Sequence, residues 1–402
     1  MFAEAPGLQL WAYPAINVIP SVPFSLMPDA IEKIGWAGLN AGLFVISVFL
    51  INGMVLKPLR SLARERNESA WRSIAAFWGL ITLMTVRHVL GPFENQSQDM
   101  LTLVAICAGM HAAQRNREGM VGLWWGLAAA LKMTPLLFLP LLFIQGRLRA
   151  FGMMICAFMI WSIVPDILVP TWDTNPRALQ FMESVSGTLA PGQSGGEIWA
   201  PWNELNQNLA GTIHRITAPL PASKGDNFSP YPLIAANEST SRTLIVTGQL
   251  LIIALVGLFA WRTRTGWFKR KSALQQDASK VIRTLSETGV VVTGMLLLSP
   301  MSSKSHFIVL LIPAAAIVLH FLRRPTCLSD IAVILGVTIA GTFTGKDLIG
   351  RPLAEALLAG GCVAFCAVLF LLGLSVLPQR DEPARIWNQS KRSRGAEAPS
   401  SS

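Results

Sequence analysis

The feature that most constrains this chain is a series of long apolar runs separated by clusters of lysine and arginine. A helix that crosses a membrane needs about 20 mostly apolar residues. Of the 402 residues, 52% are hydrophobic and only 14% are charged, whereas a water-soluble protein carries about a quarter charged residues. The sequence therefore predicts an all-α, multi-pass membrane protein and excludes a water-soluble domain.

The basic clusters also predict which side of the membrane each loop occupies. Lysine and arginine follow the first apolar run and are densest between Arg262 and Lys271, and the positive-inside rule assigns such clusters to the cytoplasm. The amino-terminal segment, residues 1–35, is then external, and the basic tail, residues 378–402, is disordered at the cytoplasmic surface. The net charge of +10 comes from these clusters, so it indicates membrane lipids and not nucleic acid as the partner. About nine crossings are expected within two transmembrane parts, 36–168 and 243–377; they are 36–56, 73–90, 100–110, 150–168, 243–261, 281–298, 307–322, 331–344 and 352–377.

Residues 119–146 form an apolar stretch of a different kind. It contains Lys132, and arginines stand near both ends, at Arg117 and Arg147. Two full crossings need about 40 residues, more than this stretch holds. Pro135 removes a backbone donor and disfavours helix at the residue before it. We therefore expect a re-entrant hairpin that folds back near Lys132; the alternative is one kinked crossing.

The longest polar segment, residues 169–242, is expected to be a large external loop. Within it, residues 199–208 interleave indole and amide side chains, among them Trp202, Asn206 and Gln207. An aromatic face can cover the apolar face of a sugar ring, and amides can hydrogen-bond its hydroxyls. This pattern favours contact with a sugar, although membrane proteins also use tryptophan at the membrane interface.

Five cationic residues lie inside or at the edge of the apolar runs, where charge is costly and each such residue is a functional candidate. They are Arg87, His88, Lys132, Lys304 and His306. For Arg87 and Lys304 the alternative is snorkelling to the membrane interface. Lys132 lies too deep to snorkel, so it requires a carboxylate, a cage of carbonyl groups or a bound anion. Together these cations suit a lipid phosphate at the headgroup level.

The cysteines suggest neither a disulfide framework nor a metal centre. None forms a pair or quartet with metal-binding spacing, so all five are expected to be small buried residues. No cofactor and no metal is expected. The five are Cys107, Cys156, Cys327, Cys362 and Cys366.

Four short motifs resemble glycosyltransferase family 87, a family of GT-C glycosyltransferases that use polyprenyl-phosphate donors. They occur in the family's order and extend from about residue 10 to 325. The motifs are Tyr13-Pro14 followed by Pro20, Pro23 and Pro28; residues 126–137, with Lys132; residues 206–212; and residues 298–300 followed by His306.

The resemblance implies a GT-C-like helical bundle in the plasma (inner) membrane. Such an enzyme moves a sugar, typically mannose, from a polyprenyl phosphate to a cell-envelope glycolipid or glycan on the outer face, with inversion at the anomeric carbon. It implies no nucleotide sugar. It places Lys132 and His306 at the donor phosphate, with Arg87, His88 and Lys304 as neighbours. The sugar or acceptor would contact Tyr13, Trp202, Asn206 and Gln207.

The sequence departs from the family at its amino terminus. The family's general base is an aspartate in the first external loop, after a first helix, whereas only twelve residues precede Tyr13 here. Glu4 is the only acidic residue in this stretch and is the candidate substitute base, and a start-truncated sequence is one explanation. The alternative function is a non-catalytic protein that binds or flips polyprenyl phosphate. A cation-coupled transporter is disfavoured because no inverted repeat is evident.

Overall fold

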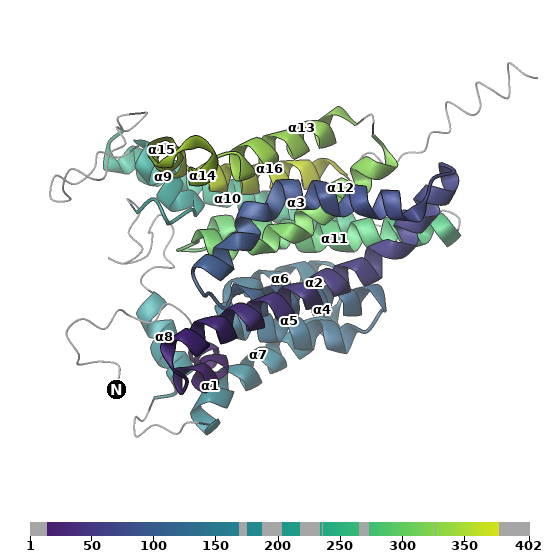
Figure 1. Cartoon of the computed structure of the whole chain (residues 1–402). Helices are drawn as coiled ribbons and strands as arrows, with labels where there is room; N and C mark the ends of the chain where they lie inside the picture. The colour runs from purple at the N-terminus through teal and green to yellow at the C-terminus, as the bar shows by residue number, and fades with distance from the viewer. Residues whose placement is uncertain are drawn as a thin grey trace, which may run out of the picture.

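The computed structural model describes residues 14–168, 175–186, 203–217, 234, 236–264, 273–325 and 327–377. Within these residues every regular element is a helix. Most of the long helices run along one common direction and form an elongated bundle (Figure 1).

The first part of the bundle comes from residues 14–168. Its elements are η1 (Ala15–Ser21), α1 (Val22–Ser25), α2 (Asp29–Glu65), α3 (Ala70–Glu94), α4 (Asp99–Gln114), α5 (Glu118–Lys132), η2 (Thr134–Leu137), α6 (Phe138–Ile144) and α7 (Leu148–Leu168).

Two short helices, α8 (Arg177–Ser186) and α9 (Leu209–Thr217), lie within the segment expected to be external. The second part of the bundle follows. Its elements are α10 (Glu238–Arg264), α11 (Ala273–Leu298), η4 (Lys304–Leu310), α12 (Leu311–Arg323), α13 (Leu328–Val337), the π-helical turn η5 (Thr338–Thr342), α14 (Lys346–Ile349), α15 (Arg351–Ala359) and α16 (Cys362–Val376).

Six helices of the described chain are long and apolar enough to cross a membrane, and the number rises to seven if α15 and α16, bent by 54° from one another, form one span. A multi-pass membrane protein is therefore what the structure supports. The expected count of nine is not confirmed. The remaining two expected crossings lie in α4, which has 16 residues and carries Asp99, and in α13 with η5, a shorter apolar helix.

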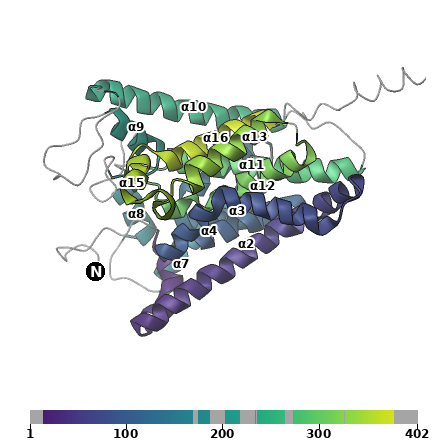
Figure 2. The ribbon, with the colours of Figure 1, turned by 45° about the horizontal axis from the view of Figure 1, so that its top comes forward.

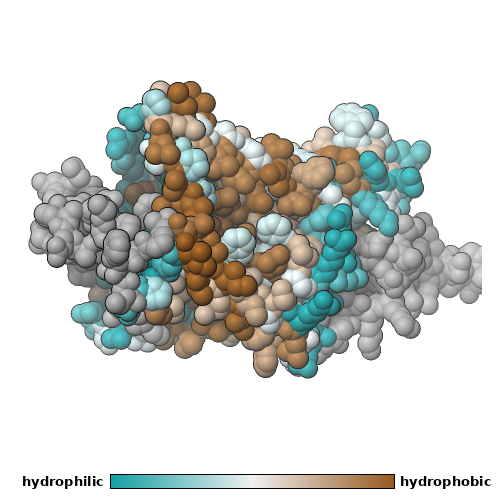
Figure 3. Space-filling view, turned by 90° about the horizontal axis from the view of Figure 1, so that it is seen from below, coloured by the Kyte–Doolittle hydropathy of each residue, from teal (hydrophilic) through white to brown (hydrophobic). Residues whose placement is uncertain are grey.

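The interior of the bundle is formed by α11 and by η4 with α12. The most apolar stretch of each of these spans is 89% buried, against 17% for α7 and 28% for α2 and α10. Figure 2 shows α10 and α2 on opposite sides of these inner helices. The outer helices expose large aliphatic side chains such as Ile160 and Leu250, 62% and 59% exposed. A belt of apolar surface between hydrophilic ends results (Figure 3), which suits contact with lipid chains.

The basic residues gather at one end of the bundle. There Arg66, after α2, donates to the carbonyl of Leu322 in α12. Gln114 at the end of α4 donates to the carbonyl of Lys280 in α11 (3.0 Å). We call this end, formed by the ends of α2, α4, α6, α10 and α12, the basic end. The opposite end carries the starts of α4 and η4 and the end of α5.

α5 and α6 fold back on one another. The ends of the two arms are joined at the basic end by Arg147, whose Nε and Nη2 donate to the carboxylate of Glu118 at 2.9 and 3.0 Å. Halfway along, Trp125 stacks on Phe138 with ring centroids 4.0 Å apart. Met133 makes the reversal with φ = 60°, a value that non-glycine residues rarely adopt. The five cysteines are less buried than expected: Cys107 and Cys366 are buried, Cys327 and Cys362 are half-buried, and Cys156 is exposed.

Candidate active site

Three charged or titratable side chains from distant parts of the sequence meet at the end of the bundle opposite the basic end. Lys132 Nζ lies 2.5 Å from Asp99 Oδ1, and His306 Nε2 lies 3.9 Å from Asp99 Oδ2. Ser97 Oγ donates to the same carboxylate at 2.8 Å. Exposed fractions of the side chains are 13% for Lys132, 3% for Asp99 and 1% for His306. The structure therefore brings Lys132 and His306 together, through Asp99; we call these three residues the Asp99 cluster.

The hairpin holds Lys132 at the cluster. Lys132 is the last residue of α5, and the strained Met133 turns the chain directly after it. Asn17 Nδ2 of η1 donates to the carbonyl of Leu131 at 2.5 Å. α5 lies very close to α7, since a Cβ on Gly126 would stand 2.6 Å from Ala157 Cβ. The position of the ammonium group is therefore set by the backbone on both sides.

The loop before η4 holds His306. The backbone N–H of Ser303 donates to Nδ1 of His306 at 3.3 Å, and Ser303 in turn caps the start of η4. This contact leaves Nε2 directed toward Asp99. α3 supports the same loop, because Gly91 packs against the backbone of Ser305 and Asn95 Nδ2 donates to Ser305 Oγ at 2.7 Å.

Asn206 and Gln207 are fully buried and bind backbone groups around the loop 299–302. Asn206 Oδ1 accepts from the N–H of Ser302 at 3.1 Å, and the N–H of Gln207 donates to the carbonyl of Ser302 at 2.7 Å. Asn208 Nδ2 donates to the carbonyls of Ser299 and Pro300 at 2.8 and 2.6 Å. The contacts described for Asn206 and Gln207 therefore hold the loop that leads to His306; the expected sugar contact stays a prediction.

Arg215 of α9 completes this polar layer. Its Nε donates to the carbonyl of Ala359 at 2.9 Å, and its Nη1 donates to the carbonyls of Asn203 and Asn206 at 2.9 and 2.8 Å. Burial lowers the pKa of Arg215 to about 10, which leaves the guanidinium charged at neutral pH. Burial also raises the pKa of Glu204, and Glu355 adds to the rise. The layer ties α9, α15 and the loop 299–302 to one another.

The described contacts of Arg87 and His88 of α3 are with η5, Thr344 and Phe307, and not with the Asp99 cluster. Arg87 Nη1 donates to the carbonyl of Gly341 at 3.1 Å and to Oγ1 of Thr344. His88 is buried, its ring lies 5.9 Å from that of Phe307, and its Nε2 has no hydrogen-bond partner among the described residues. Lys304 is half-buried at the start of η4, two residues before His306. Glu4, Tyr13 and Trp202 lie outside the described residues.

Sequence reasoning did not identify Asp99 as part of the site. It did establish that Lys132 needs a carboxylate, a carbonyl cage or an anion, and Asp99 is the carboxylate. A usable signal was present: Glu94, the last residue of α3, and Asp99, the first of α4, flank the short loop between these helices. The tip of the hairpin, at Lys132, reaches the same level of the bundle.

A small, partly open cavity lies next to the hairpin tip. It shares Ala130 and Met133 with the segment that carries Lys132, and its other walls come from η1, α7 and α8. Its lining is almost entirely apolar, so its walls match the chemistry of a hydrocarbon chain. The lining residues are Pro14, Ala15, Ile16, Ala130, Met133, Phe158, Ser162, Ala178, Phe181 and Met182.

Comparison with known protein families shows which family the sequence matches. The family model described as Glycosyltransferase family 87 matches residues 11–300, which is more than half of the chain. That range includes Asp99, Lys132 and the Asn206–Asn208 segment, and it ends six residues before His306. No curated protein and no solved structure matches the chain.

Proposed function

Because the chain belongs to glycosyltransferase family 87 and is a membrane glycosyltransferase, we propose that it moves mannose from a polyprenyl phosphate to a cell-envelope glycolipid or glycan. The observation that carries this proposal is the convergence of Lys132 and His306 on Asp99 beside an apolar cavity. A polyprenyl-phosphate sugar has a charged head and a hydrocarbon tail, and this end of the bundle offers a partner for each.

In the proposed reaction, Lys132 and His306 bind the donor phosphate. The oxygen of the acceptor hydroxyl attacks the anomeric carbon, and the bond from that carbon to the phosphate oxygen breaks with inversion. The hydroxyl proton passes to a general base, for which Glu4 is the candidate from the sequence. The departing phosphate gains negative charge, which cationic donors stabilise in a site that excludes water. Asp99 has a positioning role: it keeps Lys132 charged inside the protein while the site is empty of donor.

The isoprenoid chain of the donor is proposed to lie along the apolar walls of the cavity beside Met133. Because Met133 follows Lys132 directly, a chain along these walls would place its phosphate at the level of the ammonium group. Asn206 and Gln207 act as positioning residues through the loop 299–302. For the general base and the sugar contacts, Glu4, Tyr13 and Trp202 remain the sequence-derived candidates.

The proposed orientation places the basic end in the cytoplasm. The Asp99 cluster then faces the outer leaflet of the plasma (inner) membrane, with the amino terminus outside, the carboxy terminus inside and α5 with α6 as a re-entrant hairpin. Arg87 and Lys304 are proposed to lie toward the same end of the bundle as the Asp99 cluster and to bind lipid phosphates near the donor.

A transfer assay tests the proposal. The full-length protein in liposomes is supplied with radiolabelled polyprenyl phosphate mannose and an extract of envelope lipids, and the labelled product is measured. We expect transfer by the wild type and by a control, His111→Ala, in the last turn of α4 at the basic end. We expect none by His306→Ala of equal thermal stability.

Two results would contradict the proposal. Full activity of His306→Ala would remove that residue from the site. Movement of labelled polyprenyl phosphate across the liposome without any sugar transfer would support a carrier-binding or flipping protein instead.

A further inference from the structure

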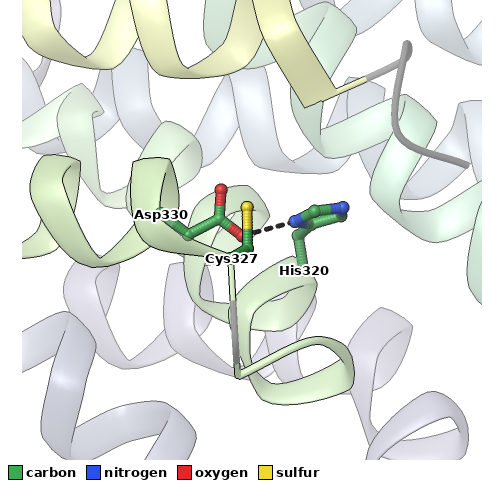
Figure 4. Close-up of side chains that lie close together, drawn as sticks. All are labelled: His320, Cys327 and Asp330. Carbon is green, nitrogen blue, oxygen red and sulfur yellow. Dashed lines mark hydrogen bonds and ion pairs between the residues drawn. The ribbon is translucent and has the colours of Figure 1, made fainter.

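A second cluster of titratable side chains lies at the basic end, where α12 ends and α13 begins. His320 Nδ1 and Asp330 Oδ2 are 2.5 Å apart, and a ligand atom of Cys327 lies within 4.8 Å of both (Figure 4). The side chains of His320 and Asp330 are 3% and 2% exposed, and Cys327 is half-buried. From this geometry we propose that His320, Cys327 and Asp330 bind a zinc ion.

The ligand types favour zinc over the hard cations. An imidazole nitrogen, a thiolate sulfur and a carboxylate oxygen are the donors that Zn²⁺ uses in proteins. Mg²⁺ and Ca²⁺ bind mainly oxygen, and only one of the three side chains offers it. A thiolate and a carboxylate together balance the charge of a divalent ion, so the complex carries no net charge inside the protein.

The geometry requires only a small adjustment. Donor atoms around tetrahedral zinc lie about 3.3 to 3.6 Å apart, given metal–ligand distances near 2.0 to 2.3 Å. The ion therefore displaces two protons to solvent, the one shared by His320 and Asp330 and the thiol proton of Cys327. It widens the separation of His320 Nδ1 and Asp330 Oδ2 by about 1 Å. Because Cys327 is half-buried, water can reach the fourth position.

The hydrogen bond to Asp330 uses only one of the two ring nitrogens of His320, Nδ1. Nε2 of His320 is buried and has no hydrogen-bond partner among the described residues, and a partly satisfied buried polar group is costly. Coordination through Nδ1 supplies binding energy that offsets this cost.

The backbone holds the three ligands in place. The N–H of Arg324 donates to the carbonyl of His320 at 3.0 Å, and the N–H of Asp330 donates to that of Cys327 at 3.1 Å. Cys327 caps α13, and Asp330 lies in its first turn. Fourteen residues of helix separate His320 from His306, roughly 20 Å, so the ion has no part in sugar transfer. It clamps the turn between α12 and α13.

Metal analysis tests this site without reference to activity. The full-length protein, purified in detergent without chelator, is measured by inductively coupled plasma mass spectrometry. We expect about one zinc per chain in the wild type and in Cys156→Ser, a control that changes an exposed cysteine of α7. Cys327→Ser loses the ion, with a fall in affinity of at least about 10- to 100-fold, the range for changes that only misorient a ligand.

Cobalt provides a second measurement should Cys327→Ser fold poorly. After chelation, Co²⁺ added to the wild type or to Cys156→Ser produces thiolate-to-cobalt charge-transfer absorption, and Zn²⁺ added back raises the melting temperature. The proposal is overturned if the wild type binds no metal and gives no such absorption. It is also overturned if Cys327→Ser keeps the same zinc content, which would place the ion elsewhere.

Discussion

The pair formed by Lys132 and Asp99 makes the sharpest prediction about stability. Asp99→Asn removes the negative charge and keeps the shape of the side chain, which leaves an ammonium group that is only 13% exposed facing a neutral amide. Removing one partner of a buried pair costs about 3 to 5 kcal/mol. Lys132→Met leaves the Asp99 carboxylate without its ammonium partner and is expected to cost a similar amount.

The double variant, Asp99→Asn with Lys132→Met, removes both charges. Replacing a whole buried pair by neutral groups is often nearly free of cost, so we expect the double variant to lose less than about 2 kcal/mol and to be more stable than either single variant. The free energy of unfolding is measured by titration with sodium dodecyl sulfate in mixed micelles, followed by tryptophan fluorescence. Glu355→Gln, in the exposed pair with Arg351, is the control and should be unchanged. Additive costs of the two substitutions would refute the reasoning, because they would show that the two charges do not interact.

Three further predictions concern the scaffold. Gly361→Ala should destabilise the protein by at least about 1 to 3 kcal/mol, because the φ of Gly361 is +81° and the new Cβ would lie 2.2 Å from a threonine methyl group of α9. The control is Gly38→Ala, which has open space around it and should show no loss of stability in thermal denaturation. Equal melting temperatures of the two variants would refute the predicted strain. Arg147→Lys should destabilise the hairpin of α5 and α6 by about 1 kcal/mol, because lysine cannot make the paired contact with Glu118. Hydrogen exchange in α6 should become faster. Unchanged exchange would show that the contact between Arg147 and Glu118 does not stabilise the hairpin. Glu204 has a raised pKa, so its contribution to stability is present at low pH and is lost as the pH rises above the ordinary value of 4.5 through the raised value. Glu204→Gln should therefore make the melting temperature depend less on pH over this range. The same pH dependence in the wild type and in Glu204→Gln would contradict the assignment.

Much of the bundle can be predicted from the sequence, because membrane insertion depends on local properties. Run length and the position of arginines such as Arg66 indicate which segments are helical and which ends lie together. The number of crossings is harder to predict. α4 is apolar enough to be read as a crossing, yet its exact length and the burial of Asp99 depend on how the neighbouring helices pack.

The candidate site shows the same division between local and tertiary information. That Lys132 needs a partner follows from its depth alone, but the choice among a carboxylate, carbonyls and an anion depends on contacts between residues 33 positions apart. Asn206 and Gln207 have the composition of a sugar-binding segment, and only the tertiary contacts show that they bind the loop 299–302. Cys327 has no partner at metal-binding spacing, and its meeting with His320 follows from the turn between α12 and α13.

The most direct test of the account is an experimental structure of the protein with polyprenyl phosphate mannose bound. We predict that a phosphate oxygen lies within about 3 Å, hydrogen-bond distance, of both Lys132 Nζ and His306 Nε2, with the hydrocarbon chain passing Met133. A phosphate bound at any other place on the protein, with both side chains out of reach, would contradict the account.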